Sequence, residues 1–305
     1  MRTLSFVVRI RYFSLKNMGT AFFYWFADLF FRLQSKYLRM TGKILEFSSH
    51  ESKSDSELRP YLHFIELAAA EPEVGNKFRR EFKYREILEH VGYFLGAKYL
   101  QELNGFEDFD IHQLKRNSAN DTYGNPRTFT LFNDLKLSTT TIRYLVVWHQ
   151  IQSFLKPTEN SKWVEIGCGY GGQAAVINRM ISIQSYTMFD VPQAEKLITQ
   201  YLREIDSKLS PIFGNLDDVQ SDQTYDFAIS NYAFSELPKK VQTKYLTNVL
   251  TKSRHGYMIM NSGQSNLSGR SSGKLSLSEI QSFLPSLKVI QEKPITGPDN
   301  YIIIW

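Results

Sequence analysis

The second half of the chain alternates short apolar runs with amphipathic segments. Apolar runs with helical spacing between them lie at 163–167, 185–190, 210–215, 225–231 and 255–261. This alternation predicts an α/β fold with a parallel sheet that is doubly wound, with helices on both faces. A capping-box pair, Ser276 and Glu279, begins one more helix. Two final runs, 287–292 and 301–305, are joined by a short Pro/Gly turn, so we expect a terminal antiparallel hairpin at one edge.

The first half is dominated by helical periodicity. Apolar positions on one face predict a helix that begins at Glu57 and is interrupted by Pro72. A second helix is expected over about 76–104, a loop over 117–127, and a third helix over 140–155.

These patterns divide the chain into three parts. We expect an N-terminal extension and linker (1–56), a helical region that covers the cleft (57–160), and a sheet domain (161–305). The hydrophobic content of 42% is that of a globular protein with a large core. The single cysteine excludes an internal disulfide, and the six histidines lack the spacing of a zinc site. We therefore expect no metal site and a reducing, cytoplasmic location.

Positive charge is concentrated in the extension. Residues 1–43 hold eight Lys and Arg against one acid, Asp28, so the rest of the chain is slightly negative although the net charge is +5. No nucleic-acid partner is expected, because such enzymes line their clefts with basic residues. The aromatic run 21–31 beside these charges is typical of a helix at the inner membrane face. Alternatively the run packs on the protein body, or translation starts at Met18 or Met40.

The strand at 163–167 runs into a glycine-rich turn with the sequence EIGCGYGG at 165–172. Glycines there let backbone amides approach a ligand and allow dihedral angles that other residues avoid. Dinucleotide-binding turns share this feature, but in them a carboxylate such as Glu165 would face a pyrophosphate. An acidic residue at this place fits a cationic ligand better. A dinucleotide oxidoreductase is the alternative.

The E-x-G-x-G-x-G motif, Asp190 at the end of the next strand, and the terminal hairpin resemble the class I S-adenosylmethionine-dependent methyltransferases. Four segments are similar to the bacterial sugar O-methyltransferase family: 163–177, 186–202, 230–238 (SNYAFSELP) and 297–305. The resemblance implies a Rossmann-like, seven-stranded methyltransferase sheet and S-adenosyl-L-methionine as cofactor. It also implies O-methylation of a sugar hydroxyl on a polysaccharide or glycolipid precursor. Alternatives are methylation of another small molecule and a non-catalytic binding module that keeps the fold.

The loop and the strand after it carry most of the expected cofactor contacts. The loop residues assigned to the cofactor are Glu165, Gly167, Gly169, Tyr170 and Gly171. A carboxylate at Asp190 can accept hydrogen bonds from both ribose hydroxyls.

Further cofactor contacts follow other elements. Asn215 and Leu216 come after the third strand, where such enzymes hold the adenine, although a plain Gly-Asn turn explains Asn215 equally well. Asn231, after the fourth strand, is expected to face the transferable methyl group. Arg143 would pair with the cofactor's carboxylate, or be an ordinary surface arginine.

A sugar hydroxyl is a poor nucleophile until its proton leaves, so a general base is expected. Glu236 is preferred because it follows strand four, where related small-molecule O-methyltransferases place a catalytic His. His255 is the second candidate, but it begins its strand at the amino end, and His149 fits a packed helix position better than a base. After strand five, Asn261, Gln264 and Arg270 would donate hydrogen bonds to a polyhydroxylated acceptor. Alternatively, the segment 262–275 is a flexible connector.

Overall fold

The computed structural model describes most of the chain. The described residues are 59–85, 87–89, 91–131, 134–220, 222–261, 273–297 and 299–305. The predicted extension and linker, Gln264 and Arg270 lie outside them.

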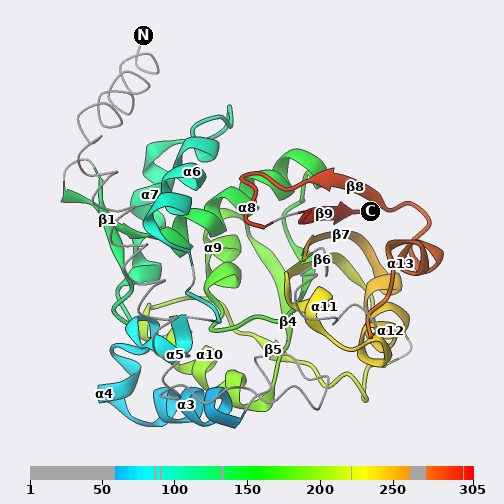
Figure 1. Ribbon diagram of the computed structural model, residues 1–305, viewed down its shortest axis with the longest axis horizontal. Helices are drawn as coiled ribbons and strands as arrows, with labels where there is room; N and C mark the ends of the chain where they lie inside the picture. Colours follow the sequence, from blue (N-terminus) through cyan, green and yellow to red (C-terminus); the bar gives the residue numbers. More distant parts are fainter. Residues whose placement is uncertain are drawn as a thin grey trace.

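A seven-stranded sheet forms the centre of the molecule, in the order β5-β4-β3-β6-β7-β9-β8 (Figure 1). Its strands are β3 (Ser161–Ile166), β4 (Ile183–Phe189), β5 (Ile212–Phe213), β6 (Tyr225–Asn231), β7 (Ser253–Met260), β8 (Lys288–Gln291) and β9 (Tyr301–Ile304). The first five are parallel, and β9 runs antiparallel to both of its neighbours. The predicted α/β sheet with its terminal antiparallel hairpin is confirmed.

Helices cover both faces of this sheet, as the doubly wound pattern predicts. The first face carries α8 (Thr139–Leu155), α9 (Gly172–Met180) and α10 (Pro192–Glu204); the second carries α12 (Lys239–Asn248) and α13 (Leu277–Phe283). Side chains alternate along β3, so that Trp163 joins the first hydrophobic cluster and Val164 the second. The order of strands reverses between β3 and β6, and ligands of open α/β sheets bind at the carboxyl ends of strands at such a point.

The N-terminal helical region is more broken than its sequence predicts. Its elements are α3 (Arg59–Ala70), α4 (Pro72–Gly75), η2 (Phe78–Arg80), α5 (Phe82–Arg85), α6 (Tyr93–Leu103), α7 (Ile111–Asn117) and η3 (Ser118–Asp121). The single helix expected over 76–104 is wrong. The chain passes through short turns, and Gly92 starts α6 from an extended N-cap with φ −70° and ψ 170°. The helix expected at 140–155 is confirmed as α8, and so is the capping box at Ser276.

Two short strands, β1 (Thr128–Thr130) and β2 (Lys136–Ser138), form an antiparallel ribbon that the sequence did not predict. The helical region also shares one continuous hydrophobic cluster with the first face of the sheet. Tyr61 of α3 and Ile302 of β9 both belong to it. The helical region therefore packs as a layer on the sheet domain.

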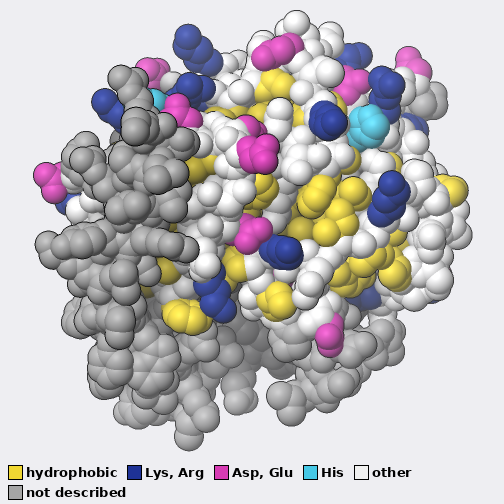
Figure 2. All heavy atoms as spheres, turned by 90° about the horizontal axis from the view of Figure 1, so that it is seen from above, with side chains coloured by type: hydrophobic (Ala, Val, Ile, Leu, Met, Phe, Trp, Pro, Cys, Tyr) yellow, Lys and Arg dark blue, Asp and Glu magenta, His cyan; other side chains and the backbone are white. Residues whose placement is uncertain are grey.

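Some large hydrophobic side chains stay exposed. Figure 2 shows a face on which hydrophobic side chains gather between charged ones. Among the described residues, Phe94 of α6, Val289 of β8 and Ile295 are each more than half exposed. Val289 lies on β8, which among the described strands pairs with β9 only. In the described ranges no helix has the length and apolar character needed to cross a bilayer.

Candidate functional site

The glycine turn connects β3 to α9 at the carboxyl edge of the sheet. Gly167, Gly169 and Gly171 have φ angles of 75°, 60° and 85°, a region that residues with a Cβ avoid. A Cβ on Gly167 would also lie 2.0 Å from Cβ of Ala233, at the start of α11 (Ala233–Glu236). The loop therefore presents bare backbone, as its sequence predicts.

Asp190 lies directly against this loop. Its carboxylate accepts hydrogen bonds from the amides of Gly169 and Val191, each at 2.8 Å. Burial raises the pKa of Asp190 to about 6, although the amides of Val191, Gly169 and Cys168 act in the opposite direction. The strand end and the glycine turn are thus brought together as expected, with an ionised carboxylate at neutral pH.

Glu165 lies beneath the turn in β3 and is 1% exposed. The Tyr186 hydroxyl donates to it at 2.9 Å. Burial raises the pKa of Glu165 to about 8; the Tyr186 hydrogen bond lowers it, and Asp190 raises it further. The carboxyl group therefore holds its proton at neutral pH in this state, and a cationic ligand would favour its ionised form.

The side chain of Tyr170 is buried and packs into the helical region. Its ring centroid lies 4.7 Å from that of Tyr201 and 5.7 Å from that of Phe78, and the guanidinium of Arg79 lies 4.8 Å above it. The cofactor contact expected at Tyr170 stays a prediction. The ring joins the glycine turn to the helical layer.

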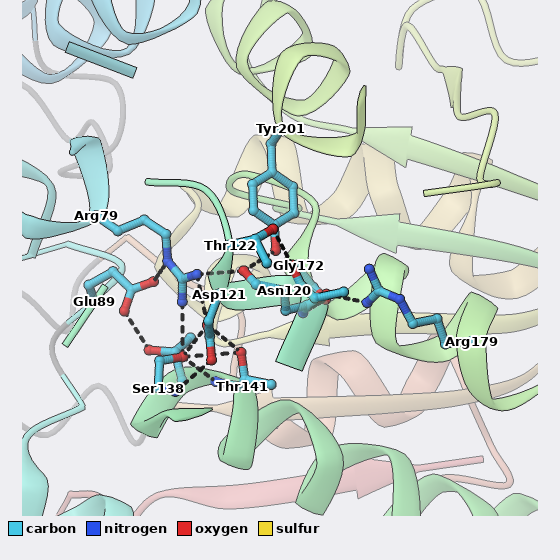
Figure 3. A network of polar contacts seen from close by, with 12 residues as sticks. Arg79, Glu89, Asn120, Asp121, Thr122, Ser138, Thr141, Gly172, Arg179 and Tyr201 are labelled. Atoms are coloured by element: carbon cyan, nitrogen blue, oxygen red, sulfur yellow. Dashed lines mark hydrogen bonds and ion pairs between the residues drawn. The ribbon is translucent and has the colours of Figure 1, made fainter. Parts of the chain in front are cut away.

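Arg79 is the centre of a buried polar network beside the turn (Figure 3). It is fully buried and pairs with Glu89 at 2.5 Å and with Asp121 at 3.0 Å. Asp121 also accepts hydrogen bonds from Ser138 and Thr141. Buried charges are tolerated when they are paired and hydrogen-bonded in this way.

The network reaches the first turn of α9 through Asn120. The Asn120 amide donates to the carbonyl of Gly172 at 3.0 Å, and the Asn120 carbonyl accepts from Arg79 and from Tyr201. In Figure 3 Asn120 lies between Asp121 and Arg179. The helical region is therefore fixed to the backbone of the glycine turn.

Arg143 is a buried cation whose guanidinium lies over the Tyr144 ring, 5.2 Å from the ring centre. It is 5% exposed, its Nε has no hydrogen-bond partner, and no carboxylate within the described ranges pairs with it. Burial lowers its pKa, but Tyr144, Tyr99 and Tyr232 raise it by more, so the net pKa lies above the usual value. The interpretation of Arg143 as a surface arginine is wrong, and a buried unpaired guanidinium suits an anionic group.

Asn231 ends β6 next to the glycine turn. Its amide lies 3.4 Å from Oε1 of Gln173 in α9, while its own Oδ1 is buried without a partner among described atoms. A buried oxygen atom without a partner at this place can accept a hydrogen bond from a ligand.

The acceptor candidates lie further along the same edge. Glu236 is exposed and accepts a hydrogen bond from the Asn261 side chain at 2.8 Å, so the ends of β6 and β7 bring these two together. His255 lies near the amino end of β7, where its ring stacks on Phe227 at 5.5 Å, away from the carboxyl edge. The structure does not bring His255 to the site.

His149 has a structural role. Its two ring nitrogens lie 3.0 Å from Asp108 and 2.8 Å from Gln113, and burial lowers its pKa although Asp108 opposes this. Cys168 is buried, which raises its pKa well above the usual value and disfavours a thiolate.

The adenine contacts expected at Asn215 and Leu216 stay predictions. Asn215 is exposed, and its side chain closes a local turn through Asp217 and Asp218. Leu216 is partly buried against the second hydrophobic cluster. These contacts fit the interpretation of Asn215 as part of a Gly-Asn turn.

Two polar residues at this edge were missed by sequence analysis. Tyr232 follows Asn231 with φ 70°, a strained angle for a tyrosine, and its hydroxyl donates to Glu292, which is 2% exposed. Glu292 also accepts from Thr296. Glu292 follows β8 and is 60 residues from Tyr232, so no local pattern marks the pair. No cluster of three metal-ligating side chains occurs in the part of the chain described.

Comparisons with known proteins give structural similarity only. No protein-family model and no curated protein matches the sequence. Similar solved structures include the N-methyltransferase NodS from Bradyrhizobium japonicum bound to S-adenosyl-L-homocysteine, at 15% identity and TM-score 0.41, covering 63% of this chain and 95% of that one. An S-adenosylmethionine-dependent methyltransferase from Clostridium acetobutylicum matches at 8% identity and TM-score 0.40, covering 53% and 88%. At these values the similarities do not assign an activity.

Proposed function

We propose that this protein is an S-adenosylmethionine-dependent methyltransferase. The observation that carries the proposal is the glycine turn at 167–171, with ionised Asp190 against its backbone and buried Glu165 beneath it. Bound S-adenosylmethionine would supply an activated sulfonium methyl group. Asp190 would hold the ribose hydroxyls, and the unpaired Arg143 guanidinium would hold the amino-acid carboxylate.

A nicotinamide dinucleotide fits these residues less well. A pyrophosphate over the turn would lie close to Asp190, and the ionised carboxylate of Asp190 would repel it. A cationic sulfonium and ammonium would be attracted by Asp190 and would favour the ionised form of Glu165.

For the acceptor we propose a sugar hydroxyl, with Glu236 as the general base. The support is the resemblance of segment 230–238 to sugar O-methyltransferases and the position of Glu236 and Asn261 at the carboxyl edge. Asn261 orients the Glu236 carboxylate, which could then take the hydroxyl proton while the oxygen attacks the methyl group in line.

A screen of activated sugars and glycolipid intermediates for methyl acceptance tests this assignment. With the acceptor found, Glu236→Gln should lower turnover by about 100-fold and leave S-adenosylhomocysteine affinity unchanged. The control is Glu66→Gln, an exposed carboxylate on α3. Full turnover in Glu236→Gln would remove Glu236 as the base. Methylation of a non-sugar small molecule, or binding of the cofactor without any transfer, would contradict the sugar assignment.

We also propose that the protein is cytoplasmic and contacts the inner membrane face through residues 1–43. Cell fractionation with and without these residues tests the contact. Equal sedimentation of both forms with membranes would contradict it.

A further inference from the structure

The cofactor edge is covered by two residues that no motif marks. Leu88 lies in the turn after α5, and a Cβ on Gly169 would stand 3.1 Å from Cδ1 of Leu88. Tyr61 of α3 is 5% exposed, and α3 packs against α10, which begins at Pro192, two residues after Asp190. Burial raises the pKa of Tyr61, and the Asp190 carboxylate raises it further. The helical region therefore lies against the middle glycine and beside the aspartate, and both residues stay partly exposed.

This cover is tied to the buried network beside the loop. Glu89, next to Leu88, accepts from Arg79 at 2.5 Å and from Thr140 at 2.7 Å. On the other side the ring of Tyr61 stacks on that of Tyr84, with centroids 6.1 Å apart. Paired buried charges and stacked rings resist local opening more than an exposed loop does.

We propose that Tyr61 and Leu88 form the outer wall of the nucleoside subsite. This rests on the proposed function, because it takes Asp190 as the ribose partner. The phenol of Tyr61 can donate to a ribose oxygen or to the Asp190 carboxylate, and Leu88 excludes water above Gly169. Because Glu89 anchors this wall, the nucleoside leaves only when the turn opens, and its dissociation is slow.

Binding of two ligands distinguishes contacts made by this wall from contacts made elsewhere in the site. S-adenosylhomocysteine contains the nucleoside and the amino-acid end, while 5′-methylthioadenosine contains the nucleoside only. Calorimetry and stopped-flow binding with the full chain should show that Tyr61→Phe raises the Kd of both ligands by about fivefold. Leu88→Ala should raise both dissociation rates by about tenfold.

Matched variants control for general damage to the helical region. Tyr84→Phe removes a buried hydroxyl that has no partner among the described residues, from a ring in the same stack. Leu62→Ala shortens a partly buried side chain of α3 in the same hydrophobic cluster. Both should bind the two ligands as the wild type does.

Wild-type affinities and rates in both Tyr61→Phe and Leu88→Ala would overturn the proposal. A change in the Kd or dissociation rate of S-adenosylhomocysteine alone would also overturn it. Tyr61 and Leu88 would then contact the amino-acid end of the ligand and not the nucleoside. If Leu88→Ala does not fold, Leu88→Val should show a smaller rise in the same rates. A wild-type protein that binds neither ligand would instead refute the proposed function.

Discussion

The carboxyl edge of the sheet has two differently built parts. At β3 and β4, Glu165 is buried and Asp190 is partly buried, and backbone amides and a tyrosine hydroxyl satisfy the two carboxyl groups. At β6 and β7, Glu236 is exposed and is held by another side chain, Asn261. A preorganised, enclosed part suits a constant ligand such as a cofactor, and an open part suits an acceptor that enters from solvent.

The largest expected effect is at the glycine turn. Gly167→Ala would place a Cβ 2.0 Å from Ala233 and force a φ of 75° on alanine. We expect a loss of more than about 3 kcal/mol in the free energy of unfolding, measured with chemical denaturant. The control is Gly273→Ala, where a Cβ meets nothing within 4 Å. Equal stability of both variants would mean that the turn is not as tightly packed as described.

Arg143 tests whether the enclosed part holds the cofactor's carboxylate. Arg143→Met should weaken S-adenosylhomocysteine by about 2 kcal/mol, roughly thirtyfold, because a charged hydrogen bond is lost. Binding of 5′-methylthioadenosine, which lacks the carboxylate, should not change. Arg116→Met, at an exposed arginine of α7, is the control in the same calorimetric titration. An equal loss for both ligands would contradict the assignment.

The burial of Glu165 should make the free energy of unfolding depend on pH. The folded state keeps the proton of Glu165 up to about pH 8, whereas the unfolded chain loses it near pH 4.5. The folded state therefore binds more protons between these values, and its stability should fall as pH rises through this window. The slope approaches about 1.4 kcal/mol per pH unit. Denaturation of Glu165→Gln should show a shallower slope, and the exposed-site variant Glu66→Gln should keep the wild-type slope.

The smallest effect is expected at Asn215. Its side chain is exposed and closes a local turn, so Asn215→Ala should cost less than about 1 kcal/mol of stability. The Kd of S-adenosylhomocysteine should change less than threefold. A tenfold rise in this Kd would instead support the adenine contact at Asn215, which follows β5.

The sequence predicted those features that are encoded locally. Short patterns of hydrophobicity and glycine predict the strands from β3 onward and the glycine turn. They also place Asp190 at the end of β4. The environment of Tyr170 could not be predicted, because Arg79 and Phe78 reach it from the distant helical layer. Tyr232 and Glu292 meet only because β6 and β8 end at the same edge.

Isothermal calorimetry with S-adenosylhomocysteine and with NAD, on the wild type and Asp190→Ala, tests the central claim most directly. The account predicts that the wild type binds S-adenosylhomocysteine and not NAD. It also predicts that Asp190→Ala weakens the binding by at least tenfold, because the ribose hydroxyls lose their acceptor. Binding of NAD without any binding of S-adenosylhomocysteine would contradict the assignment of this edge to a methyl donor.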